Sequence, residues 1–250
     1  MTEQGVMDIG KIRFGVLSPQ DIRDMAVCKV DVSKMNSGSG TIYDKLMGPV
    51  ADTNEECKLC GLKKECMGHF GYTELPEPVF QPIFIKYILS FLRCFCIKCY
   101  RLLVSKEQLE LENLLKIKKD RRFAKILKKL EKMDSCSHCG NLHPKFILKD
   151  SVFTMELKQK GASEKISAVL NIYDIKNIFD NISDEDCVLI GLEPELIHPR
   201  NLVFTCIPVL PPCSRPYVMA GNSQICDDDI THQLAEILKI CNFITNFDIF

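Results

Sequence analysis

Two groups of cysteine and histidine residues in this sequence have the spacing of metal ligands. In the first, the string CKLCGLKKECMGHFG places Cys57, Cys60, Cys66 and His69 as a C-x-x-C pair followed by a C-x-x-H pair. Two such pairs can each form a tight turn whose donors converge on one tetrahedral zinc ion. Four protein donors leave no coordination position for water, which is typical of a structural rather than a catalytic zinc. The pattern therefore predicts a structural zinc site.

Glycines surround these four ligands. Gly61, Gly68 and Gly71 can adopt the left-handed backbone conformations that a short ligand loop often needs. They favour the metal-site interpretation over the alternative, in which the cysteines are buried free thiols and the histidine lies on the surface.

The second group consists of two further C-x-x-C pairs, Cys96, Cys99, Cys136 and Cys139. Each pair alone is a weak signal, but together they match a four-cysteine structural zinc site with a long insertion between its halves. Cys94 and His138 lie in the same stretches and are competing donors, ranked below the regularly spaced four. The alternative is that these cysteines are core thiols.

Eight ligands in this order also suggest a cross-braced zinc module of the RING ubiquitin-ligase type. In that module the fifth ligand follows the histidine within a few residues. Here Cys96 comes 27 residues after His69, with a predicted helix between them. We keep this module as an alternative function, together with a free-standing zinc adaptor.

The bulk composition restricts the class of protein. The 250 residues are enough for one or two domains, and the net charge of −1 means that any nucleic-acid contact must come from a local basic patch. The opening MTEQGVMDIG lacks a signal-peptide pattern, so the 14 cysteines indicate a reducing, intracellular compartment. The most apolar stretch, residues 78–100, is interrupted by a proline and by basic residues, which argues against a membrane span.

The elements that would hold these groups form a loop-rich α+β pattern. Ser18 followed by a proline predicts a helix start after a short strand at residues 12–17. The other expected elements are a loop over 34–52, helices over 78–92, 106–132 and 173–182, strands over 145–157, 165–170 and 202–206, and a last helix opened by Asp227, Asp228 and Asp229. The proline-rich string IPVLPPCSRP is predicted to be neither helix nor central strand.

Six motifs in this sequence resemble, in the same order, the amino-terminal region of the largest subunit of multisubunit DNA-directed RNA polymerases of eukaryotic, archaeal and viral type. They are IRFGVLSPQDIRDMAV, TIYDKLMGP, ECMGHFGYTELPEPVFQPIFI, CFCIKCYRLLV, GLEPELIHPRNLVFTCIPVLPPCSRP and DDDITHQLAEILKICN, and they extend from about residue 12 to residue 243. Six motifs in order are far more specific than any one of them.

The resemblance implies a fold and a function. The fold would be the polymerase clamp core and clamp head, held by two structural zinc ions, with segments 1–95 (entry and first zinc site), 96–140 (second zinc site and basic insertion) and 141–250 (remainder of the clamp). The chain would be part of a nucleotidyltransferase and would enclose DNA in the cleft. The family's catalytic Asn-Ala-Asp-Phe-Asp-Gly-Asp string is absent, so catalytic residues and magnesium would belong to the complete polymerase outside this chain.

The resemblance also implies partners. These are the second-largest and other polymerase subunits, DNA and the RNA–DNA hybrid, with no membrane; the location would be the nucleus in a eukaryotic cell, or a virion or viral factory. Residues 116–132 contain nine Lys or Arg, and either a solvated helix face or a phosphate-facing patch would explain them. The expected nucleic-acid contacts are Lys116, Lys118, Lys119, Arg121, Arg122, Lys125 and, near the proline-rich turn, Arg215.

Overall fold

The computed structural model describes residues 10–50, 53–158, 165–220 and 224–247. The chain forms two compact units that alternate along the sequence. Unit 1 combines the segment ending at Leu17 with Phe80–Val203, and unit 2 combines Ser18–Val79 with Phe204–Phe250. These units do not coincide with the consecutive segments 1–95, 96–140 and 141–250. The division of the chain into those three functional segments remains a prediction.

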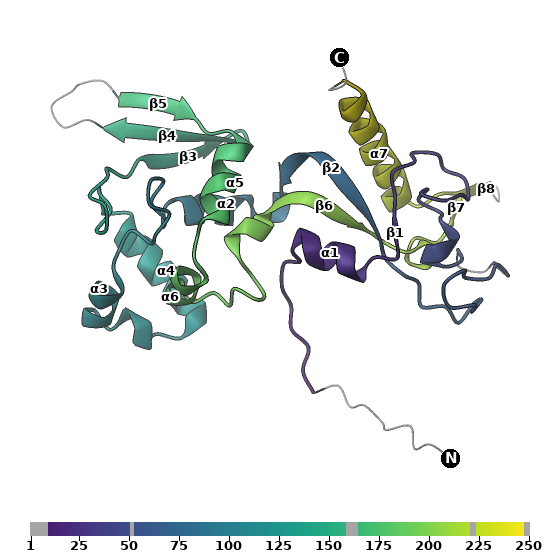
Figure 1. Cartoon of the computed structure of the whole chain (residues 1–250), viewed down its shortest axis with the longest axis horizontal. Coiled ribbons are helices and arrows are strands. Elements are labelled where there is room, and N and C mark those ends of the chain that lie inside the picture. Colours follow the sequence, from purple (N-terminus) through teal and green to yellow (C-terminus); the bar gives the residue numbers. More distant parts are fainter. Residues whose placement is uncertain (1–9, 51–52, 159–164, 221–223, 248–250) are drawn as a thin grey trace. The chain divides into compact units, whose positions relative to one another are not determined.

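Unit 2 is built around a three-stranded sheet of order β1-β2-β6 (Figure 1). Its strands are β1 (Cys28–Lys29), β2 (Gly71–Phe80) and β6 (Val203–Val209), of which the first two are parallel. The other elements are α1 (Pro19–Met25), the 3-10 turns η1 (Lys45–Met47) and η5 (Pro212–Ser214), the hairpin β7 (Val218–Ala220) and β8 (Gln224–Cys226), and the helix α7 (Asp229–Phe247). The core contains Val30, Ile42, Met47, Val209, Leu234 and Leu238.

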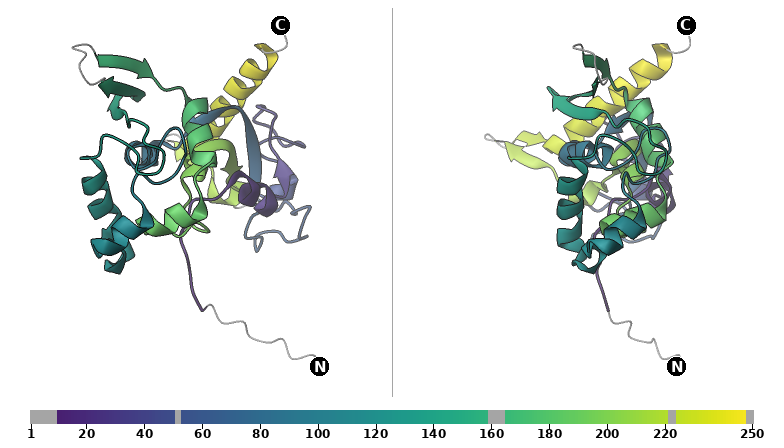
Figure 2. Two further views of the ribbon diagram at one scale, coloured as in Figure 1. Left: turned by 60° about the vertical axis from the view of Figure 1, so that its left-hand side comes forward. Right: turned by 90° about the vertical axis from the view of Figure 1, so that its left-hand side faces the viewer.

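Unit 1 combines short helices with a three-stranded antiparallel sheet of order β3-β4-β5, whose strands lie side by side in Figures 1 and 2. The strands are β3 (Lys145–Lys149), β4 (Val152–Lys158) and β5 (Lys165–Val169). The helices and 3-10 turns are η2 (Pro82–Phe84), α2 (Ile85–Leu92), α3 (Lys106–Leu111), η3 (Leu114–Lys116), α4 (Lys119–Leu130), α5 (Ile172–Asp180), α6 (Asp184–Ile190) and η4 (Pro199–Leu202). The core is made mainly of leucine, isoleucine and phenylalanine side chains, and its phenylalanines are Phe91, Phe95, Phe146, Phe153 and Phe179.

Helix starts follow the local capping chemistry. The Ser18 hydroxyl accepts a hydrogen bond from the Asp21 N–H, and the Asp21 carboxylate accepts one from the Ser18 N–H, so α1 begins where it was predicted. The predicted helix over 173–182 is present as α5, one residue earlier, with Asn171 and Asp174 forming the same reciprocal cap. These ends are predictable because all their partners lie within four residues.

Several expected elements differ from the structure. The predicted strand over 12–17 is absent, and the predicted helix over 78–92 begins only at Ile85 because β2 occupies residues up to Phe80. The basic helical region 106–132 is divided into three pieces, with Asn113 in the left-handed conformation (φ 55°) between α3 and η3. Strand β6 continues through Pro208, which is tolerated because β6 is an edge strand.

Some elements were not predicted at all. Neither α6 nor the short strands β1, β7 and β8 were predicted, and no strand was predicted for residues 71–77, which belong to β2. Within the part of the chain that the structure describes, no helix combines the length and the apolar character needed to cross a bilayer.

Candidate metal centres

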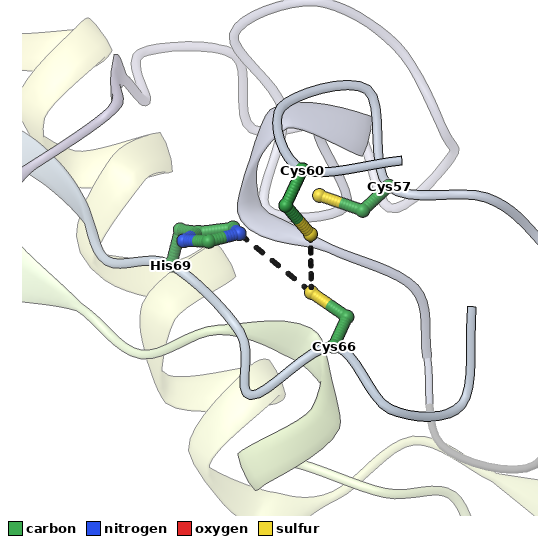
Figure 3. Close-up of side chains that lie close together, drawn as sticks. All are labelled: Cys57, Cys60, Cys66 and His69. Atoms are coloured by element: carbon green, nitrogen blue, oxygen red, sulfur yellow. Dashed lines mark hydrogen bonds between the residues drawn. The ribbon is translucent and has the colours of Figure 1, made fainter. Parts of the chain in front are cut away.

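The first ligand group forms one compact cluster in unit 2 (Figure 3). The donor atoms of Cys57, Cys60, Cys66 and His69 all lie within 4.8 Å of one another. The Cys60 Sγ is 3.5 Å from the Cys66 Sγ, which in turn is 3.6 Å from the His69 Nε2. Cys57 and Cys66 are buried, whereas Cys60 lies at the surface, so one side of the cluster faces solvent.

The C-x-x-C turn is shaped by its own backbone. The Gly61 N–H donates to the Cys57 carbonyl and the Cys57 N–H donates to the Leu62 carbonyl, both at 2.9 Å. The Leu59 N–H points at the Cys57 Sγ from 3.4 Å. Gly61 has φ +71°, as expected for the residue that closes such a turn. The turn therefore directs N–H dipoles toward the sulfur and favours its thiolate form.

The second half of the cluster depends on close packing at Gly68. This residue has φ +81°, and a Cβ built on it would lie 2.5 Å from the Cys213 Sγ and 2.6 Å from the Pro211 Cβ. A larger residue would therefore displace the loop between Cys66 and His69. Gly71 differs from the expectation: it lies in β2 without a positive φ, and its role is to leave room for the Met47 side chain, whose Sδ would be 2.7 Å from a Cβ there.

The second ligand group forms a similar cluster in unit 1, with donors again within 4.8 Å of one another. The Cys96 Sγ is 3.6 Å from the Cys139 Sγ, and the Cys99 Sγ is 3.7 Å from the Cys136 Sγ. Each pair therefore approaches the other across a long insertion in the sequence. The two halves meet only in the folded unit.

Both C-x-x-C turns of this cluster repeat the backbone pattern of the first one. The Tyr100 N–H donates to the Cys96 carbonyl at 2.9 Å, and the Gly140 N–H donates to the Cys136 carbonyl at 3.0 Å. Tyr100 and Gly140 both have positive φ, at 60° and 67°. Three turns with one geometry, two of them closed by glycine and one by tyrosine, indicate that the ligand spacing dictates the turn.

The donor geometry fits a tetrahedral ion. With metal–sulfur bonds of about 2.3 Å and metal–nitrogen bonds of about 2.05 Å, tetrahedral angles place two sulfurs about 3.8 Å apart and sulfur about 3.5 Å from nitrogen. The sulfur–sulfur distances of 3.5 to 3.7 Å and the sulfur–nitrogen distance of 3.6 Å agree with these values. They are far longer than a disulfide bond of about 2.05 Å, and all the cysteines are free.

The electrostatics of the clusters favour binding of a cation. Burial raises the pKa of Cys66 to about 11 and that of Cys99 to about 12. A backbone N–H bond from Asn141 lowers the pKa of Cys139 to about 7. The Cys66 and Cys99 thiols would thus stay protonated at neutral pH unless a divalent ion stabilised their thiolates, which is how metal binding releases protons.

The pairing of ligands excludes the cross-braced arrangement. Cross-bracing would place Cys57 and Cys60 on the same ion as Cys96 and Cys99, but each cluster draws its ligands from its own stretch of sequence. Among the described residues, neither Cys94 nor His138 joins a cluster. Cys94 is instead fully buried in the core of unit 1, where burial raises the pKa of its thiol.

The expected nucleic-acid contacts fall into three kinds of environment. Exposed positions are occupied by Lys116, Lys118, Lys119, Arg121 and Lys125. The Lys119 Nζ, however, lies 3.0 Å from the Glu193 carboxylate. Arg122 turns inward, donating hydrogen bonds to the carbonyls of Leu115, Ile117 and Val188, so it supports the fold around α4.

The prediction that Arg215 contacts nucleic acid is not compatible with its position. Its side chain is fully buried in unit 2. Its guanidinium donates to the Leu210 carbonyl at 3.0 Å, the Thr231 hydroxyl at 2.8 Å and the Ile42 carbonyl at 2.7 Å. Burial lowers the pKa of Arg215, although the neighbouring Tyr43, Asp228 and Asp227 oppose this effect. Arg215 is therefore a structural residue.

The structure adds Lys128 to the basic surface. Lys118, Arg121, Lys125 and Lys128 follow one another at intervals of three or four residues, which places them along one side of α4. All four are exposed, and none forms an ion pair with an acidic residue that the structure describes. We call these four residues the basic stripe. The same spacing is visible in the sequence and could have identified Lys128.

Comparison with known proteins agrees with the resemblance carried by the six motifs. Residues 6–247 match the family RNA polymerase Rpb1, domain 1. The chain is 35% identical over 255 aligned positions to a probable DNA-directed RNA polymerase II subunit RPB1 homolog of Invertebrate iridescent virus 6, covering 95% of this chain and 24% of that protein.

Archaeal relatives give the same result. The DNA-directed RNA polymerase subunit Rpo1N of Methanocaldococcus jannaschii is 34% identical, covering 94% of this chain and 18% of the relative. That of Thermococcus celer is 33% identical, covering 94% of this chain and 27% of the relative. The chain thus spans at most about a quarter of the length of these relatives. It belongs to the RNA polymerase Rpb1 domain 1 family, which is the amino-terminal region of the largest polymerase subunit.

Proposed function

We propose that this chain is part of a DNA-directed RNA polymerase, in which it forms a clamp that is stabilised by two zinc ions and encloses DNA in the cleft. The observation that carries this proposal is the family match over residues 6–247, which includes both closed ligand sets. A closed set of four donors suits a structural ion, so the metal would hold the fold together and take no part in the reaction.

Zinc is the ion that the donors favour. Three thiolates with one imidazole, and four thiolates, are donor sets that select zinc or iron–sulfur chemistry over magnesium or calcium, which prefer oxygen ligands. The first cluster would use Cys57, Cys60, Cys66 and His69, and the second would use Cys96, Cys99, Cys136 and Cys139. The compact tetrahedral spacing supports one ion in each.

Nucleotidyl transfer would be carried out by the assembled enzyme, with magnesium bound outside this chain. The three consecutive aspartates near the carboxyl end support this division because two of them serve the fold. Asp227 accepts a hydrogen bond from the Tyr43 hydroxyl, and the Asp228 carboxylate accepts one from the Ile230 N–H at the start of α7. The partners would be the second-largest and other polymerase subunits, acting inside the cell or in a viral particle.

The experiment that tests this proposal is purification of the native assembly through a tag on this chain. The second-largest polymerase subunit should co-purify in equal amount, and metal analysis of the isolated chain should give two zinc ions per molecule. Elution of the chain as a free monomer with no polymerase subunit would favour a free-standing zinc adaptor. A chain without zinc would contradict the structural role of the clusters.

The basic stripe would contact the phosphate backbone of DNA or of the hybrid. From Arg121 to Lys128 the rise along α4 is about 10 Å, so its cations could follow neighbouring phosphates without reading bases. Replacing Arg121 and Lys125 together by Ala should weaken duplex binding by the assembled polymerase equally for all sequences. The slope of log affinity against log salt should become shallower by about 2, one for each lost phosphate contact.

A matched double variant controls for the loss of charge. The ammonium groups of Lys119 and Lys129 already pair with Glu193 and Glu112, so changing both to Ala removes the same number of cations and should alter the slope little. Titrations of labelled duplex at several salt concentrations make the comparison. Equal slopes for the two double variants would show that α4 is only a solvated helix face.

A further inference from the structure

Residues 10–17 have the side-chain pattern of a β-strand but no strand partner among the described residues. Ile12, Phe14 and Val16 alternate with Lys11, Arg13 and Gly15. Val16 packs against the core of unit 1, whereas Ile12 is 70% exposed and Phe14 is 88% exposed. The apolar row therefore starts at the core and continues into solvent, where two large side chains remain uncovered.

The backbone of this segment is held from one side only. The Val16 N–H donates to the Leu196 carbonyl at 2.7 Å, and the Val16 carbonyl accepts from the Asn201 Nδ2 at 3.2 Å. In an extended chain the N–H and C=O of one residue share a side, and those of the next residue face the opposite side. The N–H and C=O groups of Arg13 and Gly15 therefore face away from the 196–201 turn. They form no hydrogen bond to a described residue.

Tight packing fixes the position of the segment against this turn. A Cβ built on Gly15 would lie 2.5 Å from the Leu196 carbonyl oxygen, so only glycine allows the two backbones to approach this closely. The hydrogen bonds of Val16 and the contact at Gly15 anchor the carboxyl end of the segment to unit 1. The result is an anchored segment without strand partners among the described residues, whose outer backbone edge is open.

The polar face of the segment is cationic and incompletely balanced. The hydrogen bond from Lys119 lowers the pKa of Glu193, and the nearby charges of Arg13 and Lys11 lower it further. The Lys119 Nζ is 3.0 Å from that carboxylate. Lys11 and Arg13 form no ion pair with a described acidic residue, and the Glu193 carboxylate is already paired with Lys119. An additional acidic side chain beside these two cations would therefore be stabilising.

We propose that residues 11–15 add as a strand to an exposed sheet edge of another subunit of the assembled polymerase. The receiving strand would present apolar side chains to Ile12 and Phe14 and acidic side chains to Lys11 and Arg13. Strand addition of this kind satisfies the open backbone groups and covers the two exposed apolar side chains together. This inference rests on the proposed function, because it requires the polymerase assembly.

Hydrogen exchange compares the full chain alone with the same chain in the assembled polymerase. Peptides covering residues 10–17 should exchange rapidly in the free chain, and the amides of Arg13 and Gly15 should slow by about 100-fold or more on assembly. Peptides from α2 should be protected in both states. Rapid exchange at 10–17 in the assembled enzyme would overturn strand addition while leaving the polymerase assignment intact. Failure to assemble at all would overturn the assignment itself.

Two substitutions at one position separate backbone pairing from charge. Arg13→Ala removes only the cation, whereas Arg13→Pro also removes an N–H on the open edge while keeping the preceding residue extended. Arg13→Pro should reduce incorporation into the polymerase at least about tenfold below Arg13→Ala, with unchanged melting temperature of the free chain. Equal incorporation of the two variants contradicts the inference. If the protection of residues 10–17 instead rises with the concentration of the free chain, the segment pairs with a second copy of this chain. That result also contradicts the inference.

Discussion

Replacing Cys136 by Ser should remove one of two metal ions and unfold unit 1 while unit 2 keeps its own ion. The two halves of the second cluster are separated by the whole α3–α4 insertion. In the folded unit they would be joined by the proposed metal ion and the surrounding core. Binding of zinc at such sites contributes roughly 10 to 16 kcal/mol, which is comparable to the total stability of about 5 to 15 kcal/mol that a domain usually has.

A matching substitution in the first cluster tests whether loss of a ligand unfolds only the unit that contains it. Cys57→Ser should leave the second ion bound and unfold the region around β2 in unit 2, because Cys57 and Cys66 belong to that unit. Metal analysis should give one ion for each single variant, and limited proteolysis should cut unit 1 in one case and unit 2 in the other. Cys226→Ser, which changes an exposed thiol outside both clusters, is the control. Retention of two ions in Cys136→Ser would contradict the assignment of that ligand.

The ligand sets were predictable because their information is local. A C-x-x-C pair determines its own turn, and the backbone bonds of Cys57, Cys96 and Cys136 show the same pattern in three different contexts. Helix α1 was predictable for the same reason, since Ser18 and Asp21 cap it within one turn. The pairing of each C-x-x-C with its nearest complementary pair also follows from sequence distance.

Features that depend on distant partners were not predictable. Strand β2 contains Pro76 and Pro78, which argue against a strand, and its pairing with the two-residue strand β1 is non-local. Residues 12–17 were predicted to form a short strand, but no strand partner for them lies in the described residues. The environment of Arg215 depends on acceptors at positions 42, 210 and 231, and no local pattern reveals that they converge.

Replacing Arg215 by Ala should lower the stability of unit 2 by about 3 to 5 kcal/mol, because each buried acceptor left unpaired costs about 1 to 3 kcal/mol. Its guanidinium joins three parts of that unit: the Ile42 carbonyl, the Leu210 carbonyl and the Thr231 hydroxyl on α7. It also lies 5.5 Å from the centre of the Tyr43 ring, close enough for a cation–π interaction. Thermal unfolding should show the loss as a melting temperature lower by roughly 10 °C.

A double-mutant cycle separates this structural role from a role in binding DNA. Thr231→Val removes one buried partner, so its effect should be smaller, and Arg215→Ala with Thr231→Val should destabilise less than the sum of the single changes because the two side chains share a hydrogen bond. Arg215→Lys should rescue only in part, since a single ammonium group cannot reproduce the fork that serves three acceptors. Duplex affinity per folded molecule should be unchanged in all these variants. If Arg215→Ala instead weakened DNA binding and left the melting temperature unaltered, the structural role of Arg215 would be contradicted. The guanidinium would then have to leave its buried site to contact nucleic acid.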